Sequence, residues 1–197
     1  MKVFGSIGRI GSGKDAVVKY LSKRYGLPVV SVGDMVRERA AEEGLSPTRK
    51  ELHRLSSRMI REHGKEYFMA LVLKRIEDRG WEKAGITGIR TPEDVRFLRS
   101  RLGDGLVLFH VYVGDDHTRF ERMRRRNSPR DPQTYEDFLE EDREEEAMFR
   151  IEGASAMADY SLDNSGSLED LHGQVDAIVE DGAALEAVRG GRHDRRH

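Results

Sequence analysis

A short segment near the N-terminus combines glycines with a lysine in the spacing of a phosphate-binding loop. Residues 8–14 read Gly-Arg-Ile-Gly-Ser-Gly-Lys and fill the pattern G-x-x-x-x-G-K. The glycines let backbone N–H groups curl around phosphate oxygens, and the lysine places a positive charge on the outer phosphates. An apolar run precedes the segment and a helical pattern follows it, so a helix N-terminus faces the same anion. We therefore expect nucleotide binding. The residues assigned to ATP by this pattern are Gly8, Gly11, Ser12, Gly13 and Lys14.

The residue after the lysine departs from the pattern. Asp15 stands where the motif has Ser or Thr, whose hydroxyl contacts magnesium. A carboxylate can hold Mg²⁺ directly or through water, although it also adds negative charge beside the phosphates. We expect Asp15 to belong to the ATP site and to be its metal residue, with Mg²⁺ as the cofactor.

The elements that position this loop alternate between strand and helix patterns. Apolar runs predict strands at 2–7, 28–32, 84–87, 106–113 and 159–163. Amphipathic patterns predict helices between them, and two of these helices, on either side of Gly64, follow each other without a strand. Strands alternating with helices predict a mostly parallel sheet covered on both faces, and the paired helices predict an inserted helical subdomain.

Composition excludes several classes of protein. The chain has 197 residues, 34 Lys plus Arg, 36 Asp plus Glu and no cysteine. Disulfides, cysteine-based zinc sites and thiol nucleophiles are thus excluded. No apolar run approaches the roughly 20 residues of a membrane helix, and no signal-peptide pattern is present. We expect a soluble cytoplasmic protein with no membrane partner, and near-neutrality argues against bulk nucleic-acid binding. Residues 182–197 are expected to be a disordered tail.

With the sequence Gly33-Asp34-Met35-Val36-Arg37 after the second predicted strand, the chain resembles the P-loop nucleoside monophosphate kinase family. That family includes adenylate kinases and dephospho-CoA kinases, and the match is to a poorly characterised group within it. The resemblance extends from about residue 2 to about residue 180. It implies an α/β, three-layer P-loop kinase fold: a five-stranded parallel sheet with helices on both faces, a helical acceptor-binding insertion and an arginine-bearing lid. The expected kinase-like domain spans 1–181, the insertion about 34–80 and the lid about 119–149.

By this resemblance, Asp34 and Arg37 face the phosphoryl acceptor, and Arg37 pairs with its phosphate. A guanidinium fork matches phosphate oxygens, which makes the assignment chemically sensible. Arg90, in the Gly-Ile-Arg sequence after the third predicted strand, is the second acceptor-phosphate candidate. Thr87 replaces the acidic residue that the family carries there, and we hypothesise that Asp15 supplies the carboxylate from the loop instead.

The family's lid corresponds here to an arginine-rich segment. Its six arginines are Arg119, Arg122, Arg124, Arg125, Arg126 and Arg130. The resemblance implies that some of them close over the donor phosphates, and we assign Arg126 and Arg130 to catalysis. The alternative is a basic face paired with the acidic run at 140–146, which we expect for most of the six. The resemblance also places Asn164 near the donor base; the alternative there is a turn in which Ser167 caps the last helix.

These residues predict an ATP-dependent phosphotransferase that acts on a small nucleotide-like acceptor, with a nucleoside monophosphate favoured. Lys14, Asp34, Arg126 and Arg130 are its expected catalytic residues. Transfer to a hydroxyl, as in a dephospho-CoA kinase with Asp34 as base, is the first alternative. A regulatory NTPase is the second, although no N-K-x-D signature of guanine recognition occurs. A nucleic-acid-binding module is disfavoured, because the acidic run cancels the arginine field and no aromatic residues interleave the arginines.

Overall fold

The sheet of this protein is entirely parallel. The computed structural model describes residues 1–126, 128 and 131–180, and within these residues five strands pair in the order β2-β3-β1-β4-β5. The central β1 lies between β3 and β4, with Gly5 opposite Ile86 on one side and Leu108 on the other. The parallel five-stranded sheet expected from the sequence is confirmed. The strands are β1 (Lys2–Ile7), β2 (Val29–Ser31), β3 (Lys83–Thr87), β4 (Leu106–Tyr112) and β5 (Tyr160–Asp163).

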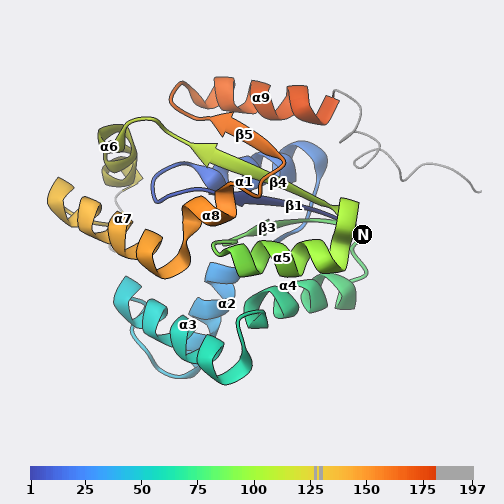
Figure 1. Cartoon of the computed structure of the whole chain (residues 1–197), viewed down its shortest axis with the longest axis horizontal. Helices are drawn as coiled ribbons and strands as arrows, with labels where there is room; N and C mark the ends of the chain where they lie inside the picture. The colour runs from blue at the N-terminus through green and yellow to red at the C-terminus, as the bar shows by residue number, and fades with distance from the viewer. Residues whose placement is uncertain (127, 129–130, 181–197) are drawn as a thin grey trace, which may run out of the picture.

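Helices connect the strands and flank the sheet on both sides (Figure 1). A 3₁₀ turn, η1 (Gly103–Gly105), precedes β4. None of the helices in the described part of the chain is long and apolar enough to cross a membrane. The helices are α1 (Lys14–Tyr25), α2 (Val32–Glu42), α3 (Arg49–His63), α4 (Tyr67–Asp78), α5 (Pro92–Leu102), α6 (Asp116–Arg126), α7 (Tyr135–Phe149), α8 (Ile151–Ser155) and α9 (Leu168–Glu180).

The two faces of the sheet bury separate hydrophobic cores. Successive side chains of a strand point to opposite faces, so Val3 and Phe4 of β1 enter different cores. Phe4 packs with α1 and α9, whereas Val3 packs with residues of α2, α3, α4, α5 and α8. Both side chains are fully buried. This arrangement is the three-layer architecture that alternating strands and helices predicted.

Two helices begin at capping signals that the sequence predicts, Ser46-Pro47-Thr48 for α3 and Thr91-Pro92 for α5. Thr48 accepts a hydrogen bond from Glu51 N at the start of α3. Thr91 and Asp94 form a reciprocal capping box at the start of α5. The pattern of Met35, Val36 and Ala40 predicts a helix from near Asp34, but α2 begins at Val32, because Ser31 accepts a hydrogen bond from Asp34 N and acts as its cap.

One helix start differs from the sequence pattern, and one short helix was not predicted. The Asp131-Pro132 pair predicts the start of the long acidic helix, but α7 begins at Tyr135, and Thr134 is its cap. The reason is that both carboxylate oxygens of Asp131 accept hydrogen bonds from Arg126. The short α8 was not predicted at all. It begins directly after Arg150, whose left-handed backbone (φ 55°) ends α7 and turns the chain.

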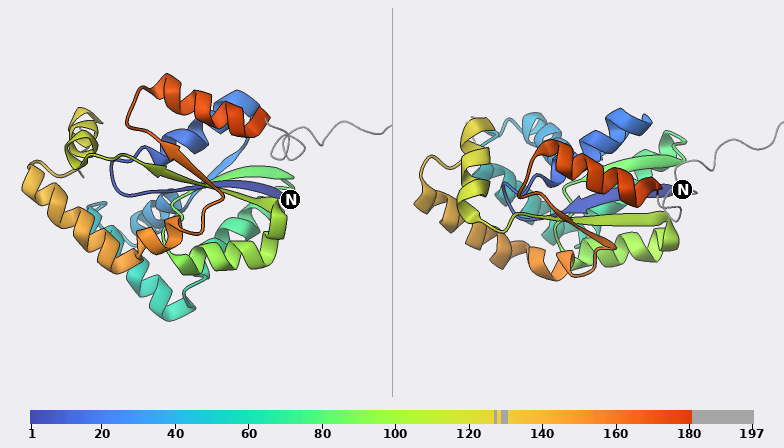
Figure 2. Two further views of the ribbon diagram at one scale, coloured as in Figure 1. Left: turned by 45° about the horizontal axis from the view of Figure 1, so that its top comes forward. Right: turned by 90° about the horizontal axis from the view of Figure 1, so that it is seen from above.

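The carboxyl ends of the parallel strands share one edge of the sheet. The loop after β1, the start of α2 after β2 and the Gly-Ile-Arg segment after β3 therefore converge there. Figure 2 shows α6 and α7 placed beyond this edge. Open parallel sheets bind ligands outside the carboxyl ends of their strands, so this edge is where a site is expected.

Candidate functional site

The glycine-rich segment forms a tight loop between β1 and α1. Gly11 (φ 72°) and Gly13 (φ 88°) are left-handed, a conformation that side chains rarely adopt. A Cβ added to Gly13 would lie 2.2 Å from Asn164 Nδ2, and one added to Gly8 would lie 2.3 Å from the carbonyl oxygen of Val111. Glycine is thus required in this loop for two reasons: other segments of the protein approach it closely, and part of its backbone is left-handed.

Buried side chains hold the loop by donating hydrogen bonds to its backbone carbonyls. Ser6 Oγ donates to the carbonyl of Lys14 at 2.8 Å, and Asn164 Nδ2 donates to the carbonyl of Ser12 at 2.8 Å. Asn164 is 6% exposed. Its side chain holds the loop, and the location near the donor base stays a prediction. The prediction of Ser167 as a cap is confirmed, because its hydroxyl accepts from Asp170 N.

One arginine of the predicted lid is part of the loop's scaffold. Arg119 is 2% exposed and donates to the carbonyl of Ile10 at 3.0 Å. Its guanidinium also forms a two-bond pair with Asp142 of α7, at 2.8 and 2.9 Å, and stacks over Phe138. Arg119 therefore belongs to the paired arginines that the sequence analysis anticipated.

A cavity of about 1000 Å³ opens at the carboxyl edge of the sheet. It extends from the phosphate-binding loop to the facing walls of α3 and α7. Six of the residues predicted to do chemistry line this one cavity. They are Lys14, Asp15, Asp34, Arg37, Arg90 and Arg126. Arg130, the other predicted catalytic arginine, lies outside the described residues, as do 182–197.

Asp34 and Arg37 pair with each other in the first turns of α2. The Arg37 guanidinium hydrogen-bonds the Asp34 carboxylate and holds the pKa of that carboxyl below its usual range. Lys19 of α1 adds a smaller effect in the same direction. The charged form of Asp34 is thus favoured by its neighbour Arg37, a pairing that the sequence analysis did not predict.

Arg90 is fixed against α7. Its Nη1 lies 3.6 Å from Glu145 Oε1, and its guanidinium stacks over the ring of Phe149 at 5.0 Å. Glu145 is buried, and the same oxygen lies 3.8 Å from Nε2 of His53 on α3. The sequence analysis did not identify Glu145, Phe149 or His53. The signal was present as the helical spacing of Phe138, Asp142, Glu145 and Phe149, but two of these are acidic members of a charged run.

Arg126 ends α6 at the mouth of the cavity. It donates two hydrogen bonds to Asp131, one of them 2.9 Å from Nε to Oδ2, and this pairing raises the pKa of Arg126. Asp15 acts on Arg126 in the same direction, so the two residues lie within electrostatic reach. Two neighbouring arginines also have partners: Arg122 donates to the carbonyl of Gly166, and Arg124 pairs with Glu121.

The residues present fit a magnesium ion bound together with phosphates. Asp15 is exposed and lines the cavity, and the Thr87 side chain lines it as well. In the described part of the chain, no group of three or more His, Cys, Asp or Glu could hold a metal by itself. Mg²⁺ typically takes one or two carboxylates and completes its shell with substrate phosphates and water. Asp15 is the residue that would hold it here.

Comparison with known proteins identifies the family. Residues 7–138 match the family model described as an AAA domain. A UPF0200 protein of Thermococcus kodakarensis is 35% identical over 176 residues, covering 88% of this chain and 94% of the relative. A second, from Methanocaldococcus jannaschii, is 32% identical and covers 92% of this chain and 90% of the relative. The chain belongs to the AAA-domain and UPF0200 families.

Solved structures with a fold similar to this member of the UPF0200 family include several small-molecule kinases. A gluconokinase from Sinorhizobium meliloti superposes with a TM-score of 0.61 at 18% identity, covering 97% of this chain and 98% of that one. A shikimate kinase from Acinetobacter baumannii, in complex with shikimate, gives 0.57 at 17% identity, covering 92% and 94%. The P-loop kinase fold expected from the resemblance is confirmed for this UPF0200 chain.

Proposed function

We propose that the protein is an ATP-dependent phosphotransferase that moves the γ-phosphate to a nucleoside monophosphate. The observation that carries this proposal is the shared cavity, which is lined by Lys14 of the phosphate-binding loop and by Arg37 and Arg90 from the segments after β2 and β3. Phosphoryl transfer depends mainly on positioning two anionic groups and neutralising their charge. A single cavity lined by a lysine of the phosphate-binding loop and by two arginines from other segments can supply both conditions.

Each residue has a distinct task in this proposal. The backbone N–H groups of the loop and Lys14 bind the donor phosphates. Asp15 holds Mg²⁺, which supplies charge neutralisation on the transferring phosphoryl group when bound. Arg37 and Arg90 bind the acceptor phosphate, and Arg126 stabilises the charge of the transition state. Arg130 has the same proposed task from a segment outside the described residues.

The electrostatics of Asp34 favour a phosphate acceptor over a hydroxyl. A hydroxyl must lose a proton during transfer, and an efficient general base has a pKa near the working pH. Arg37 lowers the pKa of Asp34 instead. A monophosphate oxygen is already an anion and needs no base. The Asp34–Arg37 pair is thus better suited to orienting Arg37 toward a phosphate.

Transfer to a hydroxyl is the second candidate. The similar folds include proteins named gluconokinase and shikimate kinase, so a hydroxyl acceptor is compatible with this architecture. In that case Asp34 lines the cavity as the candidate base. A regulatory NTPase is a third reading, in which nucleotide is hydrolysed without an acceptor. The cytoplasmic location expected from composition stays a prediction.

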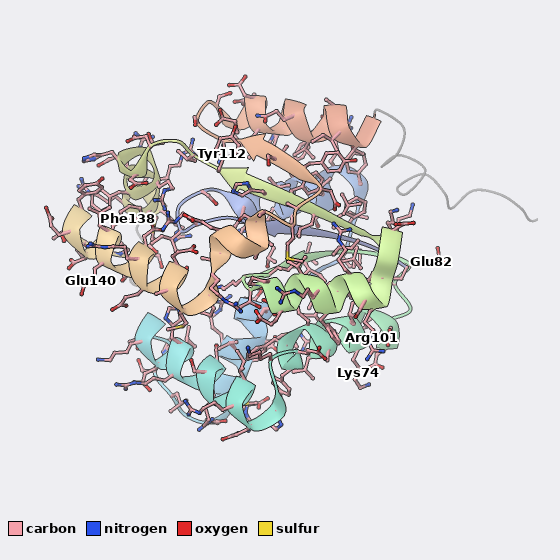
Figure 3. The ribbon with its side chains drawn as sticks, viewed as in Figure 1. Lys74, Glu82, Arg101, Tyr112, Phe138 and Glu140 are labelled. Atoms are coloured by element: carbon pink, nitrogen blue, oxygen red, sulfur yellow. The ribbon has the colours of Figure 1, made fainter. Side chains whose placement is uncertain are left out.

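An acceptor panel tests the proposal. Purified protein with ATP and Mg²⁺ is given nucleoside monophosphates, sugars, shikimate and dephospho-CoA, and ADP release is scored above the rate without acceptor. We expect stimulation by at least one monophosphate, and loss of it in Lys14→Ala. Lys74→Ala is the matched control, because Lys74 pairs with Asp78 on α4, well away from Phe138 and α7 (Figure 3). A flat panel would overturn the phosphotransferase proposal.

Two further variants assign the acceptor chemistry. Arg37→Ala is expected to raise the KM of the acceptor, whereas Arg101→Ala, on the outer side of α5, is expected to leave it unchanged. Asp34→Asn separates the two acceptor classes. A modest rise in KM supports a monophosphate, and a loss of several orders of magnitude in kcat supports a hydroxyl acceptor with Asp34 as base.

A further inference from the structure

One face of α7 contacts both the phosphate-binding loop, through Arg9, and the predicted acceptor residue Arg90. We infer that Asp142 and Glu145 are positioning residues, the first for the phosphate-binding loop and the second for the acceptor arginine Arg90. The inference rests on the proposed function and extends it. It gives α7, which lies in the segment predicted as a lid, the role of a rigid support that holds the donor and acceptor subsites relative to each other.

The buried face of α7 is defined by its spacing. Phe138, Asp142, Glu145 and Phe149 are its buried residues, and intervals of four, three and four place them on one side of a helix. Glu144, between the two buried carboxylates in sequence, is exposed. Burying a carboxylate is costly unless cations or hydrogen bonds compensate. Asp142 and Glu145 must therefore be compensated by cations or hydrogen-bond donors on the segments that pack against this face.

The groups opposite Asp142 belong to the loop or touch it. Both Asp142 oxygens accept hydrogen bonds from Arg119, and Nε of Arg9 lies 3.3 Å from Oδ2. Arg9 is a loop residue, and Arg119 in turn donates to the carbonyl of Ile10. This carbonyl belongs to the peptide that precedes Gly11 in the anion cradle. Asp142 thus fixes the orientation of a loop peptide through two arginines.

The groups opposite Glu145 belong to the acceptor wall. Glu145 lies beside Arg90 and His53, and Phe149, one turn further along α7, supports the Arg90 guanidinium from below. A guanidinium held by a carboxylate and an aromatic face loses less freedom when it binds an anion. Glu145 therefore keeps Arg90 directed into the cavity before an acceptor arrives.

The two supports are close because they share one helix. Three residues along an α-helix correspond to a rise of about 4.5 Å, less than one turn. Asp142 and Glu145 consequently hold the loop and Arg90 at a separation set by a rigid element rather than by side-chain flexibility. In phosphoryl transfer, this separation decides whether donor and acceptor phosphates meet in line.

The test compares Asp142→Asn, Glu145→Gln and the control Glu144→Gln. Nucleotide affinity is measured directly with a fluorescent ADP analogue, acceptor KM by turnover, and folding by thermal unfolding. We expect Asp142→Asn to weaken ADP-analogue binding about tenfold, and Glu145→Gln to raise acceptor KM about tenfold with nucleotide affinity retained. Glu144→Gln is expected to change neither. Two results would overturn the inference. One is a lowered unfolding temperature in both variants with nucleotide affinity and acceptor KM unchanged. The other is a loss of nucleotide affinity in Glu145→Gln as large as the loss in Asp142→Asn.

A milder variant keeps the test decisive if Asp142→Asn does not fold. Arg9→Gln removes one of the two cations at Asp142. Because Arg9 is partly exposed, we expect this variant to fold, and we expect it to weaken binding of the ADP analogue as Asp142→Asn does. Wild-type affinity in Arg9→Gln would then count against the role of Asp142. The binding measurement needs no acceptor. A wild-type protein that binds the analogue but transfers no phosphate would contradict the proposed function while leaving the Asp142 result interpretable.

Discussion

The side-chain amide of Asn164 donates a hydrogen bond to the carbonyl oxygen of Ser12 at 2.8 Å, across a separation of 152 residues in the chain. The bond ties the turn after β5 to the phosphate-binding loop after β1, although these strands are separated by β4 in the sheet. Asn164 N also donates to the carbonyl of Tyr112 at the end of β4. One buried residue thus joins the ends of three strands beneath the loop.

Replacing Asn164 with Ala is expected to destabilise the protein by about 1–3 kcal/mol, because the buried carbonyl of Ser12 loses its donor. Urea unfolding measures the loss. The control is Ser161→Ala, an exposed change on β5 that is expected to stay within about 0.5 kcal/mol of wild type. Equal stability of the two variants would show that the Asn164 bond does not hold the loop.

Gly13→Ala and Gly26→Ala separate backbone strain from close approach. Both glycines are left-handed, at φ 88° and 68°, so either alanine is expected to cost about 1–2 kcal/mol of strain. A Cβ at Gly26 meets nothing within 4 Å, whereas one at Gly13 would lie 2.2 Å from Asn164. We expect only Gly13→Ala to abolish binding of an ADP analogue. Similar binding by both variants would contradict this steric argument.

Asp15→Ala tests the carboxylate in the loop. If Asp15 is the metal residue, the Mg²⁺ concentration needed for half-maximal turnover is expected to rise about tenfold or more. Asp78→Ala removes a carboxylate that pairs with Lys74 on α4 and is expected to leave the Mg²⁺ dependence unchanged. Full Mg²⁺-dependent turnover in Asp15→Ala would show that the metal is held without this residue.

Arg126 and Arg125 form a matched pair at the end of α6. Both are exposed, but only Arg126 lines the cavity. Because an arginine that stabilises transferring phosphate contributes strongly to kcat, Arg126→Ala is expected to lower kcat by about 10²–10³-fold, and Arg125→Ala by little. Steady-state kinetics at saturating ATP distinguishes them. A comparable loss in both variants would indicate a general effect of basic charge.

The ion pair of Glu93 with Arg150 predicts a pH dependence of stability. Arg150, with Lys65, lowers the pKa of Glu93 from 4.5 to about 2. A carboxyl with a depressed pKa in the folded state stabilises fully above pH 4.5, and this stabilisation is lost as the pH falls toward 2. Glu93→Gln is expected to cost about 1 kcal/mol at pH 7, where partly exposed ion pairs contribute that much.

Unfolding of wild type and Glu93→Gln across pH 7 to 2.5 measures this effect. The difference between their unfolding free energies is expected to shrink steadily below pH 4.5, because protonated Glu93 resembles glutamine. A difference that stays constant over the whole range would show that the pair makes no pH-dependent contribution.

Short-range features were predictable because their physical causes are local. The spacing from Gly8 to Lys14, the Thr91-Pro92 helix start and the apolar run of β4 all act within a few residues. The alternation of strands and helices then predicted a parallel sheet, since parallel strands are joined by crossover connections that usually contain a helix. The family resemblance predicted that Asp34, Arg37 and Arg90 face a common acceptor, and all three line the cavity.

The support of the site depended on tertiary structure. In the sequence, Asp142 and Glu145 look like members of a solvated acidic run, and Arg119 like one of six lid arginines. Only the packing of α7 against α6, the phosphate-binding loop and Arg90 buries these charges and pairs them. Sequence therefore determined which candidate residues line one cavity, because a glycine-rich turn and the residue types after each strand can be read from short segments. The fold decided which charges hold those groups in place, because burial depends on contacts between distant segments.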